Sequence, residues 1–196
     1  MFSFNLGIAN PSSRSYLPPL RPYYTGRSLE CEDIIVKLSS ESTRLLNIFG
    51  SPGFGKTSTA IAAGHVLQAQ GHSVYFSNFQ GVISKHDFIS KILSLFWRAT
   101  TSNANVNLAP TDELCCIFYE ISCRVFIILD DLDDVLACSS VGAGITSVKD
   151  EVLHFIEEIL CRCQNVRFLT TARQSLEFED CWVSEHQDRA FMPRCL

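Results

Sequence analysis

Hydrophobic and polar positions alternate between two periods from residue 23 onward. Short, mainly apolar runs within 44–49, 72–79, 124–130 and 165–171 are typical of buried strands. Between these runs, apolar side chains recur every three or four residues, as they do along one face of a helix. These helical faces fall at 31–38, 56–70, 88–96, 114–121 and 152–160. The pattern therefore predicts helices that alternate with four strands.

Polar residues mark where several of these helices begin and end. Ser84 and Ser147 each stand three residues before an aspartate, which is the pattern of a capping box. Thr111 is expected to cap the helix that follows it, and Gly71 to end the helix over 56–70.

Helices between short apolar strands indicate right-handed crossovers and a parallel sheet. We expect an α/β fold of three layers, in which helices cover both faces of a mostly parallel sheet. Residues 1–22 are rich in Ser, Pro and Asn and are expected to form a disordered leader. One domain is expected over 23–173, and a polar, weakly patterned tail over 174–196.

Composition narrows the classes of protein that fit. Sixteen Lys and Arg against 21 Asp and Glu give a net charge of −5, which disfavours a nucleic-acid partner. No apolar run approaches the roughly 20 residues of a membrane span, and no secretory signal pattern is present. The nine cysteines lack zinc spacing and are expected to be free thiols. We therefore expect a cytoplasmic protein without a membrane partner.

Residues 50–57, GSPGFGKT, fit the phosphate-binding pattern G-x-x-x-x-G-K-[ST] and lie between a predicted strand and a predicted helix. Glycines in such a loop let successive backbone N–H groups point toward phosphate oxygens. Lys56 is expected to contact the β- and γ-phosphates and to serve catalysis, and Thr57 to ligate Mg²⁺. The residues expected to bind nucleotide here are Gly50, Gly53, Phe54, Gly55, Lys56, Thr57 and Ser58.

Two carboxylates, Asp130 and Asp131, follow the apolar run 126–129. In a parallel sheet, such a strand delivers its carboxylate to the edge where ligands bind. Asp130 is expected to hold Mg²⁺ opposite Thr57, and Asp131 to orient or deprotonate a water as a catalytic residue. An accidental acidic turn is the alternative, which the upstream phosphate loop disfavours. Asp133 and Asp134 are expected to continue as a solvated turn or helix start.

Four motifs, in this order, resemble a known family. They are YYTGRSLE at 23–30, GSPGFGKT at 50–57, LDDL at 129–132 and FLTTAR at 168–173. This order is similar to that of the NB-ARC branch of the signal-transduction ATPases with numerous domains (STAND). That branch includes the apoptosome scaffold and plant disease-resistance receptors. The resemblance covers roughly residues 17–187.

The resemblance implies a P-loop NTPase fold that binds ADP or ATP with Mg²⁺. Gly26 and Arg27 would lie beside the adenine, and Arg173 would sense the γ-phosphate; Arg27 could instead pair with Glu30 or Glu32, and Arg173 could be a surface residue. The implied role is a signalling switch in innate immunity or apoptosis, with at most slow Mg²⁺-dependent ATP hydrolysis. Its protein partners would come through oligomerisation or effector domains.

The sequence also departs from the family pattern. No Gly-x-Pro and no Met-His-Asp triplet follows Arg173, and Asp133 stands where plant members often have tryptophan. The expectation is a nucleotide-binding domain truncated after the sensor arginine, with four strands of a usual five. Three alternatives stay open: a small P-loop nucleoside or nucleotide kinase, an AAA or origin-recognition-like ATPase, and an inactive truncated fragment.

Overall fold

The computed structural model describes residues 16–20, 26–96, 108–138, 147–176 and 183–187. The strands are β1 (Leu45–Phe49), β2 (Ser73–Asn78), β3 (Val125–Asp130), β4 (Val166–Ala172) and β5 (Val183–Gln187). The helices are α1 (Ser28–Ser39), α2 (Lys56–Ala69), α3 (Lys85–Phe96), α4 (Pro110–Glu120), α5 (Asp133–Ala137) and α6 (Val148–Arg162).

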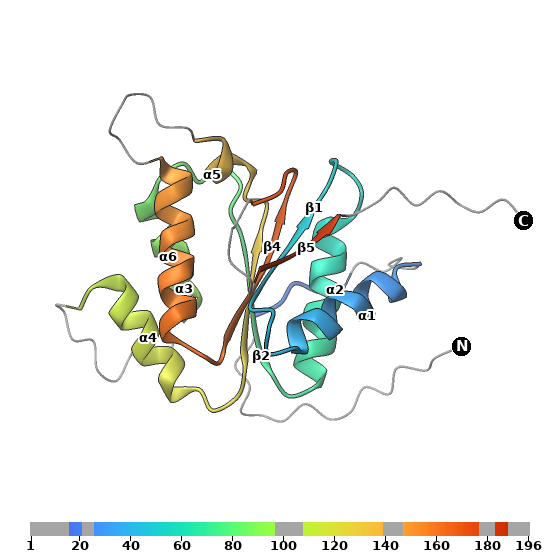
Figure 1. Ribbon diagram of the computed structural model, residues 1–196, viewed down its shortest axis with the longest axis horizontal. Coiled ribbons are helices and arrows are strands. Elements are labelled where there is room, and N and C mark those ends of the chain that lie inside the picture. Colours follow the sequence, from blue (N-terminus) through green and yellow to red (C-terminus); the bar gives the residue numbers. More distant parts are fainter. Residues whose placement is uncertain (1–15, 21–25, 97–107, 139–146, 177–182, 188–196) are drawn as a thin grey trace, which may run out of the picture.

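The strands form one sheet in the order β2-β3-β4-β1-β5, and every pair of neighbours is parallel. Helices α1 and α2 lie on one face of the sheet, and α3, α4 and α6 lie on the other (Figure 1). The predicted three-layer α/β fold is therefore confirmed.

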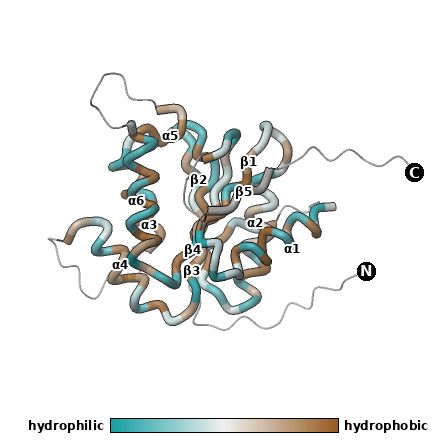
Figure 2. The backbone as a smooth tube through the Cα atoms, viewed as in Figure 1, coloured by the Kyte–Doolittle hydropathy of each residue, from teal (hydrophilic) through white to brown (hydrophobic). Residues whose placement is uncertain are grey.

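The apolar runs are continuous because both faces of the central strands are covered. In β3, Phe126 and Ile128 pack with α1 and α2, whereas Val125, Ile127 and Leu129 pack with α3, α4 and α6. Hydrophobic residues accordingly run along the strands and alternate with hydrophilic ones along the helices (Figure 2). Among the described helices, none is long and apolar enough to cross a membrane.

The sheet has five strands, so the expectation of four is wrong. The additional strand, β5, lies beyond Arg173 in the segment expected to be a weakly patterned tail. It pairs in parallel with β1, with Leu45 opposite Val183 and Phe49 opposite Gln187. Its sequence, VSEHQ, contains a single apolar residue, so the apolar pattern could not reveal a strand that pairs through its backbone.

Part of the expected disordered leader, 1–22, is attached to the sheet. The Tyr16 N–H donates to the Val74 carbonyl, and the Tyr16 carbonyl accepts from the Phe76 N–H, both at 3.0 Å. Leu17 packs against the core on the side of α1 and α2. A short extended segment can pair in this way with the edge strand β2, while the disordered leader over 1–22 stays a prediction.

The N-terminal helix caps follow the sequence at two of three places. The hydroxyls of Ser84 and Ser147 accept hydrogen bonds from the backbone N–H three residues later, at 3.1 and 3.0 Å, as predicted. The expected cap at Thr111 is wrong, because α4 already begins at Pro110, which suits a first helical position. The Thr111 hydroxyl instead donates to Glu158 at 3.4 Å.

Candidate functional site

The loop 50–55 joins the end of β1 to the start of α2 at the carboxyl edge of the sheet. Gly53 and Gly55 have φ angles of 82° and 91°, in the left-handed region that favours glycine. Gly55 is the N-cap of α2, so the loop ends at the positive pole of that helix. This is the arrangement that presents backbone N–H groups to an anion.

Two basic side chains lie on this loop. The Lys56 ammonium group donates to the carbonyls of Gly50 and Ser51, at 2.8 and 3.1 Å. A Cβ added at Gly55 would lie 3.7 Å from the guanidinium carbon of Arg27, so Arg27 packs directly against the loop. The predicted motif around Arg27 and the phosphate loop are therefore neighbours in space.

Asp130 ends β3 and is only 2% exposed. Its Oδ1 accepts hydrogen bonds from the hydroxyls of Thr57 at 2.7 Å and Thr171 at 2.8 Å. Its Oδ2 accepts from the side-chain amide of Asn78 at 2.9 Å. The ends of β2, β3 and β4 thus meet the first turn of α2 at one carboxylate.

These oxygens fit a magnesium ion. The Thr57 hydroxyl and the Asp130 carboxylate are in contact beside the phosphate loop. Mg²⁺ takes hard oxygen ligands and is commonly held by one or two protein groups together with substrate phosphates. Thr57 and Asp130 are therefore the residues that would hold it.

Asp131 follows directly, with a φ of 60°. Its backbone N–H donates to the Thr171 hydroxyl at 2.9 Å. Burial raises the pKa of the Asp131 carboxyl, and so do its hydrogen bond with Asp133 and the charges of Asp133, Asp130 and Asp134. A carboxylate with a raised pKa next to a metal site is a candidate proton acceptor.

Arg173 pairs with Asp133, at the first residue of α5. The Arg173 backbone N–H donates to one carboxylate oxygen at 2.6 Å, and its Nε lies 3.0 Å from the other. The Arg173 side chain is 65% exposed. Asp133 and Asp134 were expected to form a solvated turn or helix start, and α5 does begin at Asp133. Both carboxylates also have partners: Asp133 holds Arg173, and Asp134 accepts from the Gly81 N–H at 2.6 Å.

The structure thus brings most of the expected residues to one edge. Gly26 precedes α1, and Phe54 and Ser58 are half-buried in the loop and the first turn of α2. Two residues of the Asp130 cluster, Asn78 and Thr171, were not predicted from sequence. Asn78 pairs with Asp130 in the register of β2 and β3, so a polar residue that ends a neighbouring strand was the available signal.

No protein-family model and no curated protein matches the chain. Among solved structures, it is similar to a STAND protein with a tetratricopeptide repeat sensor from Pyrococcus horikoshii. That match has a TM-score of 0.60 at 18% identity and covers 87% of this chain and 24% of that protein.

Two further structures are similar. The Aeropyrum pernix ORC1 protein, solved in complex with DNA, matches with a TM-score of 0.60 at 16% identity, over 88% of this chain and 47% of its own. A Walker-type ATPase of Pyrococcus abyssi matches with a TM-score of 0.57 at 14% identity, over 87% of this chain and 55% of its own. The chain therefore spans between about a quarter and about half of these proteins. It has the fold of P-loop ATPases.

Proposed function

We propose that the chain is a nucleotide-binding module that takes ADP or ATP together with Mg²⁺. The observation that carries this proposal is the 2.7 Å contact between Thr57 and Asp130, at the mouth of a complete phosphate loop. Neither residue type alone would indicate nucleotide, but their contact joins the two halves of a metal–phosphate site.

The residues of this site have distinct roles in the proposal. Backbone N–H groups of the loop bind phosphate oxygens, and Lys56 leaves the Gly50 and Ser51 carbonyls to contact the β- and γ-phosphates. The bound Mg²⁺ would neutralise phosphate charge. Asn78 and Thr171 keep the Asp130 carboxylate aimed at Thr57. Asp131 orients a water, so any ATP hydrolysis depends on that carboxylate. Turnover is slow in this proposal, because a switch must keep its bound nucleotide for a long time.

We further infer that the module belongs to a cytoplasmic signalling switch of the NB-ARC type. Three observations support this: the order of the four motifs, the contact of Arg27 with the loop, and the fold shared with a STAND protein. In this role Arg27 lies at the nucleotide and Arg173 responds to the γ-phosphate, which biases a two-state arrangement.

Nucleotide binding tests the proposal directly. Fluorescent ADP should bind the purified chain, and Lys56→Ala should weaken binding at least about tenfold, because it removes a charge from the phosphates. Lys85→Ala, which removes the same charge from α3, is the matched control and should leave binding unchanged. Binding that Lys56→Ala does not alter, or no binding at all, would contradict the proposal.

A DNA-acting ATPase of the origin-recognition type is the second candidate. It is favoured by one observation, the equal TM-score of 0.60 for an origin-recognition protein solved with DNA. The net charge of −5 points the other way. Retention on duplex DNA that falls steeply with salt would select this candidate over the signalling switch.

A further inference from the structure

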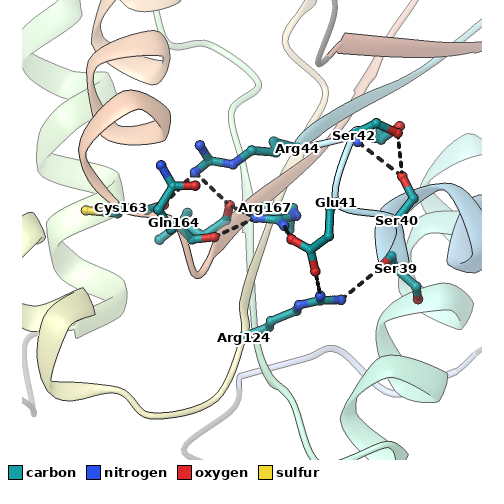
Figure 3. A network of polar contacts seen from close by, with 11 residues as sticks. Ser39, Ser40, Glu41, Ser42, Arg44, Arg124, Cys163, Gln164 and Arg167 are labelled. Carbon is teal, nitrogen blue, oxygen red and sulfur yellow. Dashed lines mark hydrogen bonds and ion pairs between the residues drawn. The ribbon is translucent and has the colours of Figure 1, made fainter.

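Three arginines gather at the edge of the sheet opposite the phosphate loop. Arg44 immediately precedes β1, Arg124 immediately precedes β3, and Arg167 is the second residue of β4. Because parallel strands start at the same edge, residues far apart in sequence meet there (Figure 3). Glu41, in the loop between α1 and β1, lies between Arg167 and Arg124.

Two of the arginines are fixed by one turn of backbone, between α6 and β4. Arg167 donates through Nη1 to the carbonyls of Gln164 at 2.8 Å and Val166 at 3.0 Å. Arg44 donates through Nη2 to the carbonyls of Cys163 and Val166. The two guanidinium groups therefore share the Val166 carbonyl, and this backbone turn holds them close together without the help of an anion.

Glu41 supplies the carboxylate that these groups contact. Its Oε2 lies 3.4 Å from Nη2 of Arg167, and its Oε1 pairs with Nη2 of Arg124. Arg124 also donates to the Ser39 carbonyl at 2.9 Å, which fixes its guanidinium over the loop. The Glu41 side chain is 82% exposed, whereas that of Arg167 is 2% exposed. An exposed carboxylate is thus paired with a buried cation.

The positive charge of the cluster is not matched. The cluster has three guanidinium groups and one carboxylate, which contacts only Arg124 and Arg167. Burial, and then the charges of Arg44 and Arg124, lower the pKa of Arg167 to about 10. Within the described part of the chain, the buried Nε atoms of Arg44 and Arg167 have no hydrogen-bond partner. Buried charged donors without a full set of acceptors are costly, and an anionic ligand that accepts from them would remove this cost.

We propose that this cluster, Arg44, Arg124 and Arg167, binds a phosphate-type oxyanion at the position now taken by the Glu41 carboxylate. That carboxylate already shows where an anionic oxygen meets both Arg124 and Arg167. Guanidinium groups bind phosphate with several parallel hydrogen bonds, and a phosphate dianion balances more of the charge than one carboxylate does. Glu41 leaves readily for solvent because it is exposed.

This oxyanion site is separate from the nucleotide site. The Arg167 end of β4 lies at the amino edge of the sheet, and the Thr171 end lies at the carboxyl edge, beside Asp130. The inference therefore does not rest on the proposed nucleotide function, and the two can fail independently.

Inorganic phosphate is the probe, added to the full chain carrying Lys56→Ala so that the phosphate loop does not contribute. Isothermal titration should show saturable binding. Glu41→Gln should tighten it about tenfold, because a competing charge is removed. Arg124→Gln should weaken it at least about tenfold. Glu32→Gln and Lys85→Gln, which make the same charge changes elsewhere, are the matched controls and should change little.

A histidine next to the cluster provides a local readout. Burial, and then the charge of Arg124, lower the pKa of His72. Phosphate bound at Arg124 should raise that pKa, which an NMR titration of the imidazole follows. O-phosphoserine serves as a second probe: tighter binding than inorganic phosphate assigns the oxyanion to a phosphorylated side chain, and weaker binding assigns it to free phosphate. Either order supports the proposal.

Three results would overturn it. The first is no saturable phosphate binding in the Lys56→Ala background. The second is binding that neither Glu41→Gln nor Arg124→Gln alters. The third is a Glu41→Gln variant that loses thermal stability which phosphate does not restore, because Glu41 would then be a structural counter-ion and nothing more.

Discussion

Replacing Thr171 with valine tests whether the Asp130 cluster is built as described. The substitution keeps the branched shape of the side chain and removes its oxygen. That oxygen donates to Asp130 Oδ1 at 2.8 Å and accepts from the Asp131 N–H at 2.9 Å. One nearly isosteric change therefore removes a contact of the expected metal ligand and one of the expected catalytic residue.

The energetic cost follows from these two bonds. A hydrogen bond to a charged group contributes about 1.5–3 kcal/mol, and leaving a buried N–H without a partner costs about 1–3 kcal/mol. The added methyl group of valine offsets part of this, so we expect Thr171→Val to lower the free energy of unfolding by ~3 kcal/mol. For a chain of this size, that corresponds to a fall in Tm of about 6–12 °C.

Thr170→Val is the matched control. Thr170 is the preceding residue of β4 and is fully buried, and its hydroxyl donates to Oδ1 of Asn47 at 2.9 Å. Both partners are uncharged, so losing this bond and leaving the buried Asn47 oxygen without it should cost about 1–2 kcal/mol, less than Thr171→Val. Thermal unfolding by circular dichroism measures both variants under the same conditions.

Nucleotide binding separates the two variants further. Thr171→Val should reduce the dependence of nucleotide affinity on Mg²⁺, because Asp130 loses one of the groups that orient it. Thr170→Val should leave that dependence unchanged. If both variants have the same Tm and the same Mg²⁺ dependence, Thr171 does not position the Asp130 carboxylate for Mg²⁺.

Two further predictions concern acid and thiol groups. Asp131→Asn should raise the free energy of unfolding at pH 7, because the raised pKa of Asp131 means that its ionised form is disfavoured in the folded chain. This gain should vanish when unfolding is measured below about pH 3.8, because the Asp131 carboxyl is then protonated in both the folded and the unfolded chain. An Asp131→Asn variant with unchanged stability at pH 7 would contradict the prediction. Iodoacetamide at pH 8 should modify the exposed thiols of Cys116 and Cys161, and spare Cys163, whose pKa is raised to about 12 by burial and then by Cys115. Peptide mass spectrometry measures this, and equal labelling of Cys163 would refute it.

Local patterns predicted the elements that bury apolar surface. The run 124–130 predicted β3 within one residue, because both faces of that strand are covered and every residue from Val125 to Leu129 is apolar. The phosphate loop was equally predictable, since its glycines and Lys56 stand in one short segment. Strand β5 escaped prediction because its pairing with β1 depends on backbone groups, which leave no trace in hydropathy.

Clusters assembled from several strands were harder to predict. Asn78 reaches Asp130 because β2 lies next to β3, an order that a list of strands does not contain. The contact of Arg44 with the turn before β4 likewise depends on a sequence separation of about 120 residues. Sequence spacing predicts which functional side chains meet within one element and its adjoining loop. Predicting which side chains meet between elements also requires the order of the strands in the sheet.

The pairing of Arg173 with Asp133 depends on an acidic residue at position 133. A tryptophan there, which the resemblance to plant NB-ARC proteins would suggest, could not accept hydrogen bonds, whereas Asp133 accepts from the Arg173 backbone and pairs with its side chain. A γ-phosphate would therefore compete with Asp133 for the Arg173 guanidinium. Because that side chain is 65% exposed, the side-chain ion pair contributes at most about 1 kcal/mol, so the competition is light. The same carboxylate also helps to raise the pKa of Asp131, so moving Arg173 to a phosphate would change the charge environment of the expected catalytic residue as well.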